Sequence, residues 1–169
     1  MINPEANPRR SRTHTITLTV NGTSYERTVE PRLTLVDFLR SELGLTGTHV
    51  GCEHGVCGAC TVLFDDHPVR ACIMLAVQAN GHKIRTVESL AHNSELHPVQ
   101  QAFWENFGLQ CGFCTAGFLM ITVDFLNRCP DPTDAEIREA LAGNICRCTG
   151  YQPIIESVKA AAEKMKENE

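Results

Sequence analysis

Hydrophobic and polar residues alternate along the start of the chain, which is the pattern of half-buried β-strands. Residues 14–20 place three aliphatic side chains on one face of such a strand. The Asn21-Gly22 dipeptide that follows is typical of a two-residue hairpin turn. Residues 24–29 are therefore expected to return as a second strand beside the first.

The stretch between this hairpin and residue 88 predicts one helix and three further strands. Residues 34–43 carry apolar side chains at helical spacing, with Thr34 as a suitable first residue and Gly44 as the stop. Residues 61–64 and 69–72 form a second predicted hairpin, and residues 83–87 a last short strand. Together these elements predict a small mixed sheet crossed by one helix.

After residue 88 the hydrophobic period changes from two to 3.6, which predicts amphipathic helices. Thr133 and Glu136 have the spacing of a capping box, so one of these helices is expected to begin there. Core packing is the expected role of Phe103 and Trp104 in the first of them. Short loops join the four helices, which are predicted at residues 98–107, 115–127, 133–141 and 154–166.

The change of period divides the chain into two modules and gives an α+β fold class. A sheet domain is predicted over residues 13–88 and an all-helical four-helix-bundle domain over residues 89–169. Residues 1–12 are polar and contain prolines, so they are expected to be a flexible tail.

Charge and hydropathy limit the kinds of partner that the protein can bind and its location in the cell. The 169 residues carry a formal net charge of −5, which argues against nucleic acid or an anionic membrane surface as a partner. No apolar run is long enough for a membrane span. Arg9-Arg10 is followed by a strand-like pattern and not by the apolar core of an export signal, so a cytoplasmic location is expected.

Eight of the nine cysteines fall into two groups of four, and each group is a complete ligand set for a metal centre. The first group has the C-x4-C-x2-C spacing of plant-type 2Fe-2S ferredoxins, followed by a fourth cysteine. The second has a C-x2-C pair followed much later by a C-x-C pair. The predicted ligands are Cys52, Cys57, Cys60 and Cys72 in the first group and Cys111, Cys114, Cys146 and Cys148 in the second.

Glycines beside the cysteines support an iron-sulfur interpretation. Thiolate-held clusters are anionic, and glycines let backbone N–H groups approach the sulfurs closely. Three glycines lie in or beside residues 51–60, and Gly112 lies inside the C-x2-C pair. Residues two apart on a helix point in nearly opposite directions, so Cys146 and Cys148 are expected to sit in a turn or at a helix end.

Cysteines also form disulfides and structural zinc sites. An odd cysteine count without a signal segment disfavours a disulfide framework. Zinc remains open, chiefly for the second group, because C-x2-C pairs are common in structural zinc sites. Cys129 follows an apolar helix and is expected to be a structural cysteine. His54 is expected to be a solvated loop residue, because the first group already has four cysteines.

Three segments resemble one family closely: residues 51–61, 110–117 and 143–151 are similar to the small iron-sulfur subunit of the molybdenum hydroxylases. That family includes xanthine dehydrogenase, carbon monoxide dehydrogenase and the quinoline-type oxidoreductases. The resemblance extends over residues 14–165, with all eight cysteines in order. It implies a plant-ferredoxin-like β-grasp domain, a four-helix domain and two 2Fe-2S clusters.

The resemblance also implies partners and an electron route. A large subunit would hold molybdopterin cytosine dinucleotide and a medium subunit FAD, assembled as a dimer of heterotrimers. Electrons would pass from molybdenum through the second cluster and the first to FAD. Gln110 and Cys148 match positions close to the pterin. The His-Gly-Val between Cys52 and Cys57 hints at an N-heteroaromatic substrate. A ferredoxin serving another redox partner and a zinc-stabilised interaction module are the alternatives.

Overall fold

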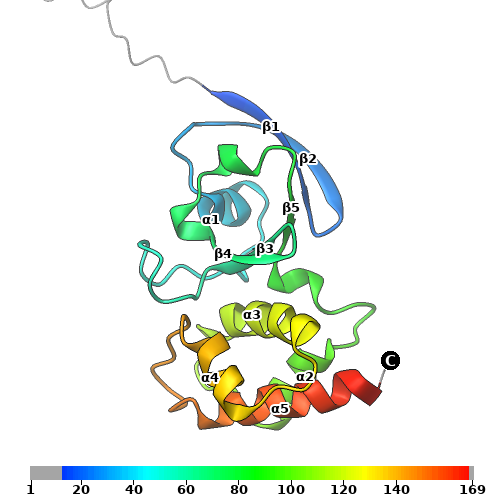
Figure 1. The fold of residues 1–169 in the computed structure, drawn as a ribbon. Coiled ribbons are helices and arrows are strands. Elements are labelled where there is room, and N and C mark those ends of the chain that lie inside the picture. The colour runs from blue at the N-terminus through cyan, green and yellow to red at the C-terminus, as the bar shows by residue number, and fades with distance from the viewer. Residues whose placement is uncertain (1–12, 168–169) are drawn as a thin grey trace, which may run out of the picture.

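The computed structural model describes residues 13–167 of the chain, and the predicted tail at residues 1–12 lies outside this range. Figure 1 shows a β-sheet with a short helix at one end of the molecule and a group of four helices at the other. The α+β class predicted from the sequence, with the sheet first and the helices second, is confirmed.

The sheet has five strands in the order β2-β1-β5-β3-β4. Strands β1 and β5 are parallel, and all other neighbours are antiparallel. The Asn21-Gly22 turn joins β1 to β2 with both residues at positive φ, as the predicted hairpin requires. The strands are β1 (His14–Val20), β2 (Thr23–Val29), β3 (Thr61–Phe64), β4 (His67–Arg70) and β5 (Lys83–Arg85).

The predicted helix crosses the sheet. It starts as α1 (Leu35–Asp37) and continues as a single π-helical turn, Phe38–Glu42. The Thr34 hydroxyl accepts a hydrogen bond from the Asp37 N–H at 3.2 Å, which satisfies one of the free amides at the helix start. The apolar side chains of the helix are buried in one cluster with the aliphatic residues of the sheet, so the first domain has its own hydrophobic core.

Two strand boundaries differ from the prediction. The strand predicted over residues 69–72 is observed as β4, His67–Arg70, and Cys72 instead lies in a 3₁₀ turn, Ala71–Ile73. The Ala71 N–H donates to the carbonyl of Cys60 at 3.2 Å, which turns the chain back toward the cysteine loop. The last strand ends at Arg85 rather than at residue 87, because a 3₁₀ turn, Val87–Ser89, follows it.

The second domain contains the four predicted helices, with α3 between the sheet domain and the other helices (Figure 1). Helix α3 contacts β3 and β4 on one side and α2 and α4 on the other, so it is buried along most of its length. Helix α5 packs on α2 and α4. The helices are α2 (Pro98–Glu105), α3 (Thr115–Arg128), α4 (Asp134–Leu141) and α5 (Gln152–Glu167).

Details of the helices test the sequence predictions. The capping box is confirmed: the Glu136 N–H donates to the Thr133 hydroxyl, and the Glu136 carboxylate accepts from the Thr133 N–H. Phe103 is buried in the helical core as expected, but the prediction for Trp104 was wrong, because its side chain is 71% exposed. In residues 13–167 no helix is both long and apolar enough to cross a membrane.

Candidate iron-sulfur centres

The first group of cysteines lies mainly in one loop, between the helix and β3. Gly55 and Gly58 adopt φ values of 81° and 77°, a left-handed backbone conformation that favours glycine. The thiol of Cys52 interacts with that of Cys57, and the thiol of Cys60 with that of Cys72. The loop and the turn after β4 thus bring the four predicted ligands together as two pairs.

Backbone amides surround the exposed side of this group. The Cys57 N–H donates to the Cys52 sulfur at 3.4 Å. Hydrogen bonds from the amides of Cys57 and His54 lower the pKa of Cys52 to about 6, so its thiolate is stabilised before any metal binds. Burial has the opposite effect on Cys60 and raises its pKa to about 11. His54 itself is exposed in the loop, as predicted.

The second group comes from two segments far apart in the sequence. Cys111 lies in the loop before α3, and Cys114 is the N-cap residue that directly precedes α3. Cys146 and Cys148, which were expected in a turn or at a helix end, lie in the loop between α4 and α5. This loop is the turn that their spacing requires. The thiols again form pairs, Cys111 with Cys148 and Cys114 with Cys146.

Thr149 and Tyr151 organise the loop around Cys146. The Thr149 amide and hydroxyl donate to the Cys146 sulfur at 3.4 and 3.2 Å. Burial pushes the pKa of Cys146 upward, but these two donors leave it below its ordinary value. The Cys146 N–H donates to the Tyr151 hydroxyl oxygen at 3.0 Å. For Cys114, burial dominates and raises the pKa to about 12.

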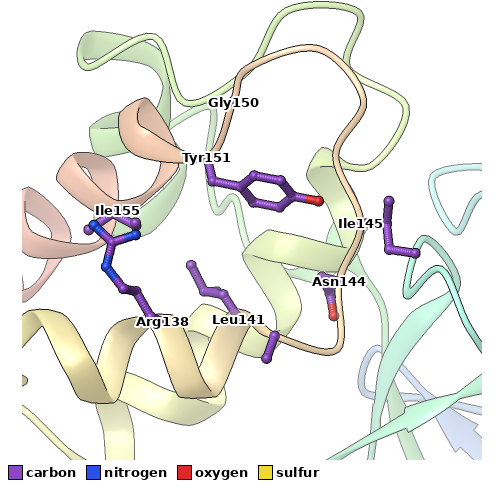
Figure 2. A pocket seen from close by; sticks show the side chains of 8 residues that line it. Arg138, Leu141, Asn144, Ile145, Gly150, Tyr151 and Ile155 are labelled. Carbon is purple, nitrogen blue, oxygen red and sulfur yellow. The ribbon is translucent and has the colours of Figure 1, made fainter.

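Tyr151 also lines a hollow of about 370 Å³ between α4, α5 and the cysteine loop. Figure 2 shows its ring across this hollow, with the hydroxyl turned away from Arg138 and Ile155 and toward the loop. The ring packs edge-on against Phe118 of α3, with 6.5 Å between the centroids. The tyrosine therefore connects the loop that carries Cys146 and Cys148 to the core of the helical domain.

The pairing of the thiols fits a two-iron cluster in each domain. A 2Fe-2S cluster takes four thiolates, two on each iron, whereas a structural zinc takes four around one point. Two adjacent pairs with amide and hydroxyl donors on the sulfurs match the needs of an anionic cluster.

The remaining predicted residues fall outside the two groups of thiols or at their edge. Gln110 is exposed, directly before Cys111, and both Cys111 and Cys148 are exposed as well. Cys129 ends α3, donates its N–H to the Phe125 carbonyl at 2.8 Å and packs half-buried on the helical core. That position agrees with the structural role expected of it.

Sequence reasoning missed the residues that join the two domains. Arg70, at the end of β4, donates to Gly143 and Asn144 of the second cysteine loop. His49 stacks on Phe113, with ring centroids 4.9 Å apart, and its Nδ1 lies 2.8 Å from the Phe113 carbonyl oxygen. Nothing in the spacing of these residues signals a contact, since each lies far from its partner in the chain.

Comparisons with known proteins agree with this arrangement. Residues 18–83 match the 2Fe-2S iron-sulfur cluster binding domain, and residues 86–159 match the [2Fe-2S] binding domain. The boundary predicted at residue 88 falls near the junction of the two matches and stays a prediction. The chain thus contains two 2Fe-2S binding domains, which supports iron-sulfur centres over zinc.

Several relatives align over nearly the whole chain. The chain is 59% identical to caffeine dehydrogenase subunit gamma of Pseudomonas sp. (strain CBB1), over 88% of this chain and 91% of that protein. It is 54% identical to the nicotine 6-hydroxylase small subunit of Paenarthrobacter nicotinovorans, over 85% and 86% of the two chains.

A solved structure has the same fold. The structure of quinoline 2-oxidoreductase from Pseudomonas putida 86 superposes with a TM-score of 0.90 and 47% identity, covering 94% of this chain and 99% of that one. With matches to two cluster-binding domains and relatives of this similarity, the chain belongs to the small 2Fe-2S subunits of the molybdenum hydroxylase family and is one subunit of a multi-subunit molybdenum oxidoreductase.

Proposed function

We propose that this chain carries electrons from a molybdopterin centre on a large subunit, through its helical domain and then its sheet domain, to FAD on a medium subunit. Each 2Fe-2S cluster, when bound, accepts and releases one electron at a time. The ligands we assign are Cys52, Cys57, Cys60 and Cys72 in the sheet domain and Cys111, Cys114, Cys146 and Cys148 in the helical domain.

The observation that carries this proposal is the pairing of eight thiols into two groups within one chain whose domains share a packed junction. Helix α3 belongs to the helical core and also contacts β3 and β4, so the two groups keep a fixed relation to each other. Electron tunnelling falls steeply with distance. A rigid chain with two centres spans a gap that neither centre spans alone.

The exposed thiols indicate where the molybdenum subunit docks. Cys111 and Cys148 interact with each other at the surface, and Gln110 is exposed beside them. We assign Gln110 as a hydrogen-bond partner of the pterin and Cys148 as a cluster ligand next to it. Trp104 and Phe107, 71% and 78% exposed, lie on the segment that leads to Gln110. Such exposed aromatic side chains are typical of subunit contacts.

The relatives suggest the class of substrate. Caffeine, nicotine and quinoline, which appear in the names of three similar proteins, are all N-heteroaromatic compounds. We propose that the complex containing this chain hydroxylates a compound of that class. The substrate would bind on the molybdopterin subunit, and this chain would supply the centres that carry the electrons away.

Metal and flavin content of the complex purified from its own host would test the assignment. We expect about four irons per copy of this chain, two for each cluster, with about one molybdenum and one flavin. A mass about twice that of one heterotrimer would support the dimer of heterotrimers. Four irons without molybdenum would instead indicate a ferredoxin for another partner, and zinc in place of iron would overturn the proposal.

Substrate-driven reduction gives the functional test. The visible spectrum of the clusters should bleach when the complex is mixed anaerobically with an N-heteroaromatic substrate, and should not respond to carbon monoxide. In Gln110→Ala, we expect the cluster spectrum to be unchanged and substrate-driven bleaching to slow. Bleaching at the original rate would count against the assigned contact between Gln110 and the pterin.

A further inference from the structure

A backbone hydrogen bond joins the two cysteine loops. The Ile145 N–H donates to the carbonyl oxygen of Cys57 at 2.9 Å. Ile145 directly precedes Cys146, so a predicted ligand of the first centre and one of the second are separated by a single hydrogen bond and a short stretch of backbone. This is the point where the two loops touch.

Arg70 holds both loops at this point. Its Nη2 donates to the Gly143 carbonyl at 2.6 Å and to the Asn144 Oδ1 at 3.0 Å, which fixes the second loop. Its Nη1 donates to the Thr61 hydroxyl oxygen at 2.6 Å, and that hydroxyl donates to the Gly58 carbonyl at 2.6 Å, which fixes the first. One guanidinium thus connects the two loops through four polar groups.

Asn144 completes the contact from the opposite side. Its side chain is 3% exposed, and its Nδ2 donates to the Gly58 carbonyl at 3.4 Å. A Cβ on Gly58 would lie 2.6 Å from the Asn144 side chain, and a Cβ on Gly117 would lie 2.2 Å from the Gly58 carbonyl oxygen. Because neither glycine has a side chain, the first cysteine loop can approach both Asn144 and helix α3 closely at Gly58.

The chemistry of Arg70 suits positioning. The side chain is half-buried, and every acceptor just described is neutral; the ion pairs recorded within residues 13–167 do not include it. A planar fork of donors fixes the directions of several hydrogen bonds at once, which the ammonium of lysine cannot do. Arg70 is therefore placed to fix the position of the second cysteine loop relative to the first.

We propose that Arg70, together with Asn144, is a positioning residue that fixes the gap between the two clusters by clamping residues 143–145 onto residues 57–58. This inference rests on the proposed function, because it requires a cluster on each side of the junction. It adds to that function two residues that are not ligands. Loss of the clamp should widen or loosen the gap while both sets of four cysteines stay intact.

The test uses the complete complex carrying Arg70→Lys or Arg70→Gln. Iron content and the separate paramagnetic signals of the two reduced centres report whether each cluster is present. The magnetic interaction between the two reduced centres, seen as splitting or broadening of their signals, reports the gap. We expect four irons and both signals to persist in each variant, with the interaction splitting weakened in Arg70→Lys and lost in Arg70→Gln.

A matched control separates the clamp from a general effect of changing an arginine. Arg32→Lys alters an exposed arginine that pairs with Glu30, and it should leave the splitting as in the unaltered complex. Unchanged splitting in both Arg70 variants would overturn the positioning role. Absence of a second cluster signal in the unaltered complex would instead contradict the proposed function itself, so the two failures are distinguishable.

A measurement without substitution keeps the inference testable if the variants fail to assemble. Hydrogen exchange of the unaltered complex should show the Ile145 amide to be among the slowly exchanging amides of residues 142–151, because it donates within a clamped junction. Free exchange at Ile145 would show that the loops separate readily and would overturn the clamp.

Discussion

The two cysteine sites are built in different ways. In the sheet domain, Cys52, Cys57 and Cys60 come from a single loop whose path is set by two glycines at positive φ. In the helical domain, one pair of cysteines precedes or begins α3, and the other pair lies in the loop after α4. The first site is largely determined by local backbone conformation, whereas the second exists only when the helices are packed.

This difference teaches where cluster binding and folding are coupled. A cluster in the helical domain would link two segments that are distant in the chain, so its binding would close a long loop and stabilise the bundle. A cluster in the sheet domain would mostly fix a loop that already has its turns. Loss of the second cluster should therefore cost the fold more than loss of the first.

The largest expected effect comes from removing one ligand in each site. Cys57→Ser and Cys148→Ser should each lower the iron content from about four to about two per chain, because each disables one cluster. Only Cys148→Ser should also abolish hydrogen-exchange protection in residues 142–151. Cys129→Ser is the control and should retain four irons. Equal loss of protection in Cys57→Ser and Cys148→Ser would contradict the stronger coupling of folding to cluster binding in the helical domain.

The next largest effect is expected from a change at the contact between α3 and the first cysteine loop. In Gly117→Ala the new Cβ would lie 2.2 Å from the Gly58 carbonyl oxygen, so α3 must move away from the first loop. We expect a loss of about 1–3 kcal/mol in the free energy of unfolding, measured by urea denaturation. In Gly81→Ala nothing lies within 4 Å of the Cβ, but φ is +83°, so only backbone strain of about 1–2 kcal/mol is expected.

The two glycine variants should differ in their effect on the contact between the domains. Gly117→Ala should also weaken the magnetic interaction between the clusters, which Gly81→Ala should leave intact. An undisturbed interaction in Gly117→Ala would mean that the junction accommodates the methyl group without moving the loops.

A smaller effect is expected within the cysteine site of the helical domain. Tyr151→Phe leaves the Cys146 N–H without the hydroxyl oxygen that accepts from it at 3.0 Å. We expect a loss of about 1 kcal/mol in stability and faster hydrogen exchange at the Cys146 amide. The paramagnetic signal of the first cluster should not change. Tyr25→Phe, which keeps the ring next to Arg27 on β2, is the matched control.

The smallest effect tests the helical domain away from its cysteines. Thr133→Ala removes the capping box of α4 and should cost about 1 kcal/mol in thermal unfolding experiments, with Thr133→Ser close to the original. Hydrogen bonds from Thr133 lower the pKa of Glu136. Its contribution is therefore present above the ordinary carboxyl pKa and is lost as the pH falls, so the Thr133→Ala difference should shrink in acid. A constant difference would mean that the hydroxyl alone carries the cap.

Predictions from the sequence succeeded where a local rule decides the outcome. The Asn21-Gly22 hairpin, the start of α1 at Thr34 and the capping box at Thr133 depend on residues within a few positions of each other. Trp104 was misplaced because apolar character predicts burial, while only the packing of α2 on α5 decides which side faces the core. Cys72 was misplaced because a contact with Cys60, and not strand propensity, ends β4.

The sequence by itself determined the two groups of four cysteines, the order of the two domains and the glycines that shape the first loop. Spacing along the chain controls these features directly, through backbone conformation and hydrophobic period. Only the tertiary structure decided how Cys111 and Cys114 meet Cys146 and Cys148, and how Arg70 joins the two loops. Those contacts link residues far apart in the chain, and their positions depend on the packing of whole helices against a sheet.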